Sequence, residues 1–140
     1  MLVNEYTPGQ GIMPHVDGPL FYPVVTTINL NSHTLLDFYH PVNDDLKENS
    51  KDDSITQEQR HFASLLLEPR SLNILTEDMY TRYLHGITEH QVDLLDSKVI
   101  NLDSCFNFPE NKKLQRDTRV SLTIRYVPKV LNVKLKFGKK

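Results

Sequence analysis

Residues 119–126 read Arg-Val-Ser-Leu-Thr-Ile-Arg-Tyr, so polar and apolar side chains alternate along this stretch without a break. Because successive side chains of a β-strand point to opposite faces, a period of two predicts a strand with one polar and one apolar face. The polar face carries Arg119 and Arg125 and is predicted to form a pocket wall, while the apolar face packs in the core. The alternative is a solvated strand face with two surface arginines. Either arrangement requires a sheet with different surroundings on its two sides.

Short strands separated by turn residues are predicted along most of the remaining chain. The predicted strands cover 2–6, 12–17, 24–30, 34–39, 64–67, 71–75, 84–87 and 118–127, with a weak one near Val99 in an irregular connection over 88–114. Residues 31–32 and 68–70 are predicted as the turns of hairpins, and 77–83 as a short helix after Thr76. Residues 43–59 are predicted to be an exposed polar loop. This pattern predicts a mainly β fold, a double-stranded β-helix (jelly roll) with few short helices.

Length and composition limit the classes of protein. The 140 residues suit a single domain over 1–140. With 16 Lys and Arg against 18 Asp and Glu, the net charge is -2, so a nucleic-acid partner would need a local basic patch. The single cysteine, Cys105, suits a reducing compartment, the cytoplasm or the nucleus. The first residues resemble neither a signal peptide nor a membrane span, so a soluble protein without membrane contact is expected.

His15 and Asp17 lie two positions apart in a predicted strand and would therefore point to the same face. A non-haem Fe(II) site uses two histidines and one carboxylate on one face of the metal and leaves positions open for a co-substrate and oxygen. The pair supplies two of these three ligands and requires a second histidine from elsewhere in the chain. The alternative is a polar strand end, because such a pair also occurs by chance.

Arg119 and Arg125 are six positions apart. This places them roughly 20 Å apart along one strand face, at about 3.3 Å per residue. They cannot share one carboxylate head-on, but their long side chains would close on a short dianion that lies between them. Asn4 and Tyr6, on one face of the first predicted strand, would supply further polar donors.

Several separated motifs resemble one known family. In chain order they are Asn4, Tyr6, Pro8, Gly9, Gly11, His15, Asp17, His85-Gly86-Ile87, Arg119 and Arg125. Together they resemble the AlkB family of Fe(II)- and 2-oxoglutarate-dependent dioxygenases. Finer features, such as Gly18-Pro19-Leu20, resemble the AlkB homologue 6 subfamily. The resemblance runs from residue 2 to residue 131, and it is specific because five separated motifs agree.

The resemblance implies a site and a reaction. The implied iron ligands, which also form the catalytic centre, are His15, Asp17 and His85. Arg119 would bind the C5 carboxylate of 2-oxoglutarate with help from Asn4 and Tyr6, and Arg125 would lie near Asp17 and the C1 carboxylate. Oxygen would convert 2-oxoglutarate to succinate and CO2 while a C–H bond of the substrate is hydroxylated. An N-methyl group hydroxylated in this way is released as formaldehyde.

The implied function is oxidative demethylation of methylated RNA or DNA in the cytoplasm and nucleus. The basic tail, residues 129–140 with five lysines, would be a phosphate contact, or it is simply a frayed end. A first alternative is a protein-directed hydroxylase or demethylase, because the acidic run over 43–53 would repel a phosphate backbone. A second alternative is a truncated, inactive metal-binding module that acts by binding partners.

Two departures from the family pattern carry consequences. Ser121 stands where other branches of the family place an asparagine, so a third contact to the co-substrate is expected to be missing. Family members also carry a region before the strand that begins here at Leu2, which supplies helices behind the main sheet and much of the nucleotide-recognition lid. Without those helices, the apolar face of strand 118–127 is expected to be exposed. The chain is therefore expected to self-associate, or to be a fragment or a mis-started gene model.

Overall fold

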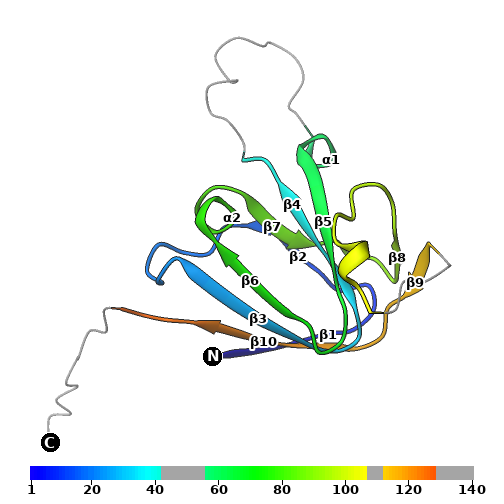
Figure 1. Ribbon diagram of the computed structural model, residues 1–140, viewed down its shortest axis with the longest axis horizontal. Coiled ribbons are helices and arrows are strands. Elements are labelled where there is room, and N and C mark those ends of the chain that lie inside the picture. The colour runs from blue at the N-terminus through cyan, green and yellow to red at the C-terminus, as the bar shows by residue number, and fades with distance from the viewer. Residues whose placement is uncertain (42–55, 107–111, 129–140) are drawn as a thin grey trace, which may run out of the picture.

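The computed structural model describes residues 1–41, 56–106 and 112–128 (Figure 1). Most of the predicted polar loop, residues 43–55, and the basic tail, residues 129–140, lie outside the described residues. The described end of that loop is helical instead: α1 (Gln57–Arg60) is preceded by Thr56. The hydroxyl of Thr56 accepts a hydrogen bond from the backbone of Gln59, and the Gln59 side chain accepts one from the backbone of Thr56. This capping box explains why a helix begins there.

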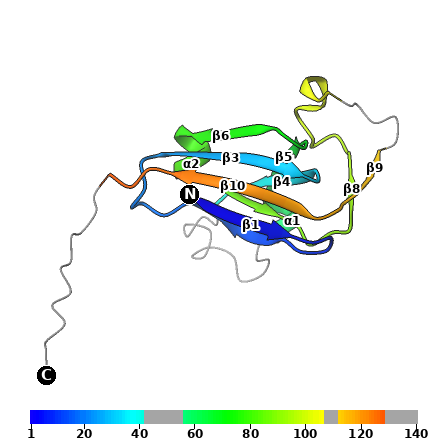
Figure 2. The same cartoon turned by 90° about the horizontal axis from the view of Figure 1, so that it is seen from below.

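Two four-stranded antiparallel sheets form the body of the described chain. Sheet A has the strand order β1 (Leu2–Tyr6), β10 (Arg119–Arg125), β3 (Val24–Asn31) and β6 (Leu72–Thr76), and Figure 2 shows these strands side by side. Sheet B has the order β2 (Ile12–His15), β7 (Leu84–Ile87), β4 (Thr34–Tyr39) and β5 (His61–Leu67). The predicted mainly β jelly-roll fold is confirmed.

The remaining described elements are short. They are α2 (Glu77–Thr81), the 3-10 helix η2 (Leu102–Ser104), and the paired strands β8 (Val92–Leu94) and β9 (Lys113–Gln115). The strand predicted near Val99 is wrong, since Val99 forms only an isolated bridge to Ser64. Its side chain instead packs with Leu35 and Leu66 on the outer face of sheet B. No helix within the described residues is long and apolar enough to cross a membrane.

Both predicted hairpins are wrong, because the strands on either side of each turn belong to different sheets. β3 pairs with β10 and β6, whereas β4 pairs with β5 and β7. The two connections are therefore crossovers, and hydrogen bonds hold them side by side. The backbone N–H of Arg70 donates to the carbonyl of Asn29 at 2.6 Å, and that of Asn29 donates to Ser71 at 2.9 Å. The turns form because Asn31 and Arg70 adopt positive φ angles of 66° and 69°.

The alternating strand β10 turns its polar face inwards, which corrects the prediction that its apolar face is core. Arg119, Ser121 and Thr123 are buried. Ile124 and Tyr126, on the other face, are 41% and 65% exposed. The physical reason is that sheet B covers the polar side. The expected exposure of the apolar face is thus confirmed for Ile124 and Tyr126, whereas Val120 and Leu122 are half-buried.

The core between the sheets fills the space next to this polar face. Its buried members are Val25, Leu36, Phe38, Leu67, Leu75, Tyr80 and Ile87, drawn from both sheets and from α2. These side chains occupy inward positions of their strands, in the alternation that a sandwich requires. The apolar outer face of sheet A is formed by Val3, Ile28, Leu30, Leu72, Ile74, Val120, Leu122 and Ile124, which share one side by strand register. We refer to these eight residues as the outer apolar face.

Candidate active site

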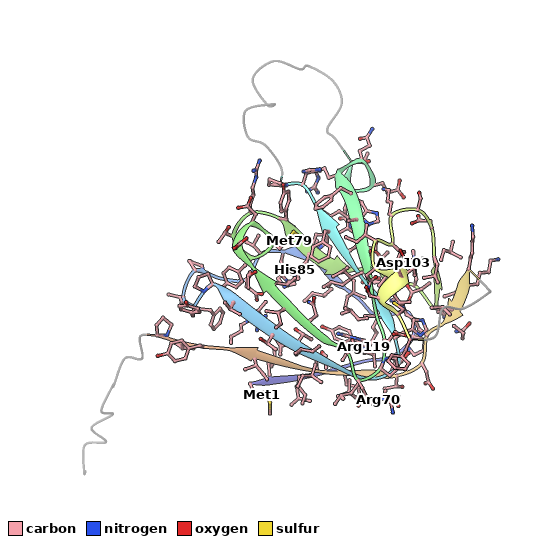
Figure 3. The ribbon with its side chains drawn as sticks, viewed as in Figure 1. Met1, Arg70, Met79, His85, Asp103 and Arg119 are labelled. Atoms are coloured by element: carbon pink, nitrogen blue, oxygen red, sulfur yellow. The ribbon has the colours of Figure 1, made fainter. Side chains whose placement is uncertain are left out.

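A cavity of about 110 Å³ lies between the inner faces of the two sheets. It is lined by all seven side chains that the sequence singled out: Asn4, Tyr6, His15, Asp17, His85, Arg119 and Arg125. In Figure 3, His85 lies near α2 and Arg119 lies towards the opposite end of β3 and β6. The strands β1, β10, β2 and β7 thus bring together residues that are far apart in the sequence, and they place them along one cavity.

His15 and His85 come together because β2 and β7 pair with these two residues opposite each other. Their ring centroids are 4.5 Å apart. Asp17 follows directly after β2, and its Oδ2 lies 3.8 Å from Nε2 of His85. Gly86 permits this close approach, because a Cβ atom there would lie 2.8 Å from the carbonyl oxygen of Ile12. Two imidazoles and one carboxylate therefore meet at one end of the cavity.

Hydrogen bonding and burial at this end suit metal ligands. Nδ1 of His15 lies 2.9 Å from the carbonyl of Met13. A carbonyl oxygen only accepts, so Nδ1 donates, and in a neutral ring the lone pair then belongs to Nε2. Burial, reinforced by the neighbouring His15, lowers the pKa of His85 to about 4 against the opposing effect of Asp17. His85 is therefore neutral at pH 7. Oδ2 of Asp17 and Nδ1 of His85 are buried with no hydrogen-bond partner in the described structure.

The donor set fits iron in its chemistry, since two neutral imidazoles and a carboxylate are the ligands of non-haem Fe(II). A buried carboxylate oxygen without a hydrogen bond, beside a neutral imidazole, is also an environment that a cation would satisfy. As they stand, however, the described residues contain no group of three or more His, Cys, Asp or Glu side chains arranged to hold an ion. The ring centroids of His15 and His85 lie 4.5 Å apart, with the two ring planes inclined at 52°.

Arg125 lies at the same end of the cavity, as the resemblance implies. Its Nη2 pairs with Oδ1 of Asp17, and its guanidinium lies 5.3 Å from the ring centre of Phe21. Its Nε is buried without an acceptor in the described structure. Arg125 thus fixes one oxygen of Asp17 and leaves the other free towards His85.

Arg119 occupies the other end of the cavity and is only 5% exposed. Its Nε donates a short hydrogen bond to Oδ1 of Asn29, and its guanidinium lies 5.5 Å from the ring centre of Tyr6. Within the described part of the chain, no carboxylate pairs with it. Burial lowers the pKa of Arg119 to about 10, yet the group remains charged at pH 7. A buried cation without a counter-ion is costly, and such a residue is typical of a site that binds an anion.

Further polar side chains line the cavity. Ser121 and Thr123, which the alternation of β10 places on the pocket wall, lie there as predicted, and Asn4 donates to Thr123 at 3.4 Å. Sequence reasoning missed Asn29 beside Arg119 and Thr27 in the lining. The available signal is the same period of two: Thr27 and Asn29 place polar side chains on one face of β3, opposite Thr123 and Ser121, whereas Ile28 and Leu30 lie on the other face.

Known proteins resemble this chain over most or all of its length. It is 51% identical over 140 residues, its whole length, to the probable RNA/DNA demethylase ALKBH6 of Danio rerio, of which it covers 58%. It is 31% identical over 130 residues to an uncharacterised protein of Acanthamoeba polyphaga mimivirus, covering 92% of this chain and 48% of that protein. A tRNA (carboxymethyluridine(34)-5-O)-methyltransferase alkbh8 of Xenopus tropicalis is 29% identical over 131 residues, which are 91% of this chain and 18% of that protein. No family model matches the chain.

The fold and the site define a class: a jelly-roll protein whose cavity holds a two-histidine, one-carboxylate donor set at one end and a buried arginine at the other. The 51% identity to ALKBH6 along the whole chain shows which family of such proteins this chain comes from. The chain belongs to the AlkB family. It spans about half the length of the first two relatives, 58% and 48% respectively.

Proposed function

We propose that residues 1–140 form the catalytic domain of an Fe(II)- and 2-oxoglutarate-dependent dioxygenase. The observation that carries this proposal is that one cavity has a cationic side chain at one end and a set of metal-ligand side chains at the other. Arg119 is a buried cation without a carboxylate partner in the described structure, and the donors His15, Asp17 and His85 lie at the other end. A co-substrate that is a dianion at pH 7 and also binds a metal suits such a cavity.

His15, Asp17 and His85 would hold the iron. When bound, the ion couples the oxidation of 2-oxoglutarate by oxygen to the hydroxylation of a substrate C–H bond. The chain's own residues prepare this site. The carbonyl of Met13 fixes the tautomer of His15, and burial keeps His85 neutral. His85 therefore offers a lone pair at neutral pH without first losing a proton, and a neutral His15 ring would offer its Nε2.

Arg125 and Arg119 would each bind one carboxylate of 2-oxoglutarate. Arg125 holds Oδ1 of Asp17 and so orients this carboxylate. Its buried Nε is a donor without an acceptor, which would suit the C1 carboxylate of the co-substrate. Arg119 would pair with the C5 carboxylate, above the ring of Tyr6. Asn4 donates to Thr123 in the same wall and would complete the polar lining.

The substrate we propose is methylated RNA or DNA, demethylated with release of formaldehyde, succinate and CO2. The support is the similarity to ALKBH6, named a probable RNA/DNA demethylase, over the full chain. The single cysteine suits the cytoplasm and the nucleus, where such substrates occur. Oxidation of a protein side chain is the second candidate, favoured by the acidic composition of residues 43–53.

Succinate formation tests this function directly. The purified chain is incubated with Fe(II), 2-oxoglutarate and oxygen, with methylated RNA, methylated DNA, a methylated peptide or no substrate. We expect the highest succinate yield with a nucleic acid, accompanied by formaldehyde. If only the methylated peptide increases the succinate yield, the substrate is a protein and not a nucleic acid. A folded sample without turnover in any arm would refute both enzyme functions in favour of an inactive binding module.

Arg119→Ala tests the assignment of the co-substrate end. Loss of its paired charge-assisted hydrogen bonds should weaken the binding of 2-oxoglutarate by about 100-fold. Metal binding should persist, because the three donors are untouched. Calorimetric titration of the Mn(II)-loaded protein measures this effect, with Arg82→Ala, an exposed arginine after α2, as the control. Unchanged affinity in Arg119→Ala would contradict the assignment.

A further inference from the structure

Asn29 is fully buried, at 0% exposure, on the inner face of β3. Its Nδ2 lies within 2.9–3.0 Å of three backbone carbonyl oxygens, those of Ser32, Leu67 and Glu68. An amide nitrogen only donates, so these three acceptors fix which end of the side-chain amide faces the two crossovers. The opposite end, Oδ1, is thereby directed at Arg119, whose Nε donates to it.

This contact determines which edge of the guanidinium remains available. A planar guanidinium can present two pairs of parallel donors to a carboxylate, and one of those pairs includes Nε. Because Asn29 occupies Nε, only the pair formed by Nη1 and Nη2 remains. The ring of Tyr6, 5.5 Å away, restricts the guanidinium plane from one side. Neither constraint depends on a bound ligand.

We infer that Asn29 is a positioning residue, which orients Arg119 so that its Nη edge receives the distal carboxylate of the co-substrate. This inference rests on the proposed function, because it assigns the way in which the same cavity binds 2-oxoglutarate. Asn29 does not itself line the cavity, so it acts through Arg119. It also joins the co-substrate end of the site to the two crossovers that connect sheets A and B.

A purely structural role for Asn29 would explain the same hydrogen bonds. The test therefore needs a control variant that also loses side-chain-to-backbone hydrogen bonds of an asparagine. Asn101 provides it. Its Oδ1 accepts from the backbone N–H of Leu66 at 2.8 Å, and its Nδ2 donates to the Leu66 carbonyl at 3.0 Å. Leu66 belongs to the apolar cluster outside sheet B, away from the cavity. Asn101→Ala therefore also removes side-chain-to-backbone hydrogen bonds but does not touch Arg119.

The experiment compares Asn29→Ala, Asn101→Ala and the unmodified chain. Thermal unfolding and calorimetric titration of 2-oxoglutarate into the Mn(II)-loaded proteins are measured for each. Both variants should unfold at lower temperature, but only Asn29→Ala should weaken 2-oxoglutarate binding, by about tenfold. In the Arg119→Ala background, Asn29→Ala should have no additional effect on affinity. Equal affinity in the two asparagine variants, or an additional loss in that background, would overturn the inference.

A second measurement needs no asparagine variant and remains available if Asn29→Ala fails to fold. Nuclear magnetic resonance of the unmodified chain should show a slowly exchanging Nε–H signal, absent in Arg119→Lys, because this proton is buried against Asn29. Rapid exchange of this proton would overturn the inference. Failure of the unmodified chain to bind 2-oxoglutarate would instead refute the proposed function and this inference with it. Normal binding by the unmodified chain and by Asn29→Ala would refute the inference alone.

Discussion

Replacing Gly86 with alanine tests how the close contact between β2 and β7 assembles the metal end of the cavity. The added Cβ would lie 2.8 Å from the carbonyl oxygen of Ile12, and 3.0 Å and 3.1 Å from the backbone N and Cα of Pro14. All three are backbone atoms, which cannot rotate away as a side chain would. To restore an ordinary contact of 3.4 Å, β2 must retreat by about 0.6 Å. His15 would move with it, relative to His85.

The expected cost follows from this overlap. Overpacking against a rigid neighbour destabilises a folded chain by about 1–3 kcal/mol. Urea unfolding followed by circular dichroism measures this loss, and Co(II) absorption measures metal affinity, which should fall because two ligands are displaced from each other. Gly18→Ala is the matched control, because its Cβ would meet nothing within 4 Å. The reasoning would be refuted if Gly86→Ala were as stable as Gly18→Ala and bound Co(II) as tightly.

Two further predictions concern metal binding and acid. His15→Ala should abolish Co(II) binding, because two ligands hold a metal poorly, whereas His90→Ala, at an exposed histidine, should leave it unchanged. Burial would raise the pKa of Asp93, but the nearby imidazole of His33 and the hydrogen bonds from Arg116 lower it below the ordinary 3.8. The stabilisation from Asp93 is therefore complete above that value and is lost as the pH falls through the lowered pKa. Urea unfolding between pH 5 and pH 2 should show this loss, and Asp93→Asn should remove part of the pH dependence.

Much of the fold and the candidate site could be predicted from local pattern. The period of two identified β10 and placed Arg119 and Arg125 on one face, and the predicted strand over 12–17 is observed as β2 up to His15, with Asp17 two residues beyond its end. These predictions depend only on the geometry of a single strand, which the sequence states directly. All of these side chains line the cavity.

What could not be predicted depends on which strands become neighbours. A turn with Asn31 at positive φ suits a hairpin as well as a crossover, so local chemistry does not decide between pairing and a change of sheet. In the same way, alternation shows that β10 has two faces but does not show which one sheet B covers. Asn29 was missed for this reason, because its importance comes from three carbonyls of two crossovers that only the tertiary structure brings together.

The outer apolar face has a thermodynamic consequence. Part of this face stays accessible to solvent in the folded state, since Val3, Leu72 and Ile74 are 59%, 60% and 54% exposed. Covering such a surface with another layer of protein would contribute about 25 cal/mol for each square ångström removed from water. It would also give a negative change in heat capacity, the robust calorimetric marker of apolar burial. The unfolding heat capacity of this chain should therefore be small for its length, and it should increase when a second layer covers sheet A.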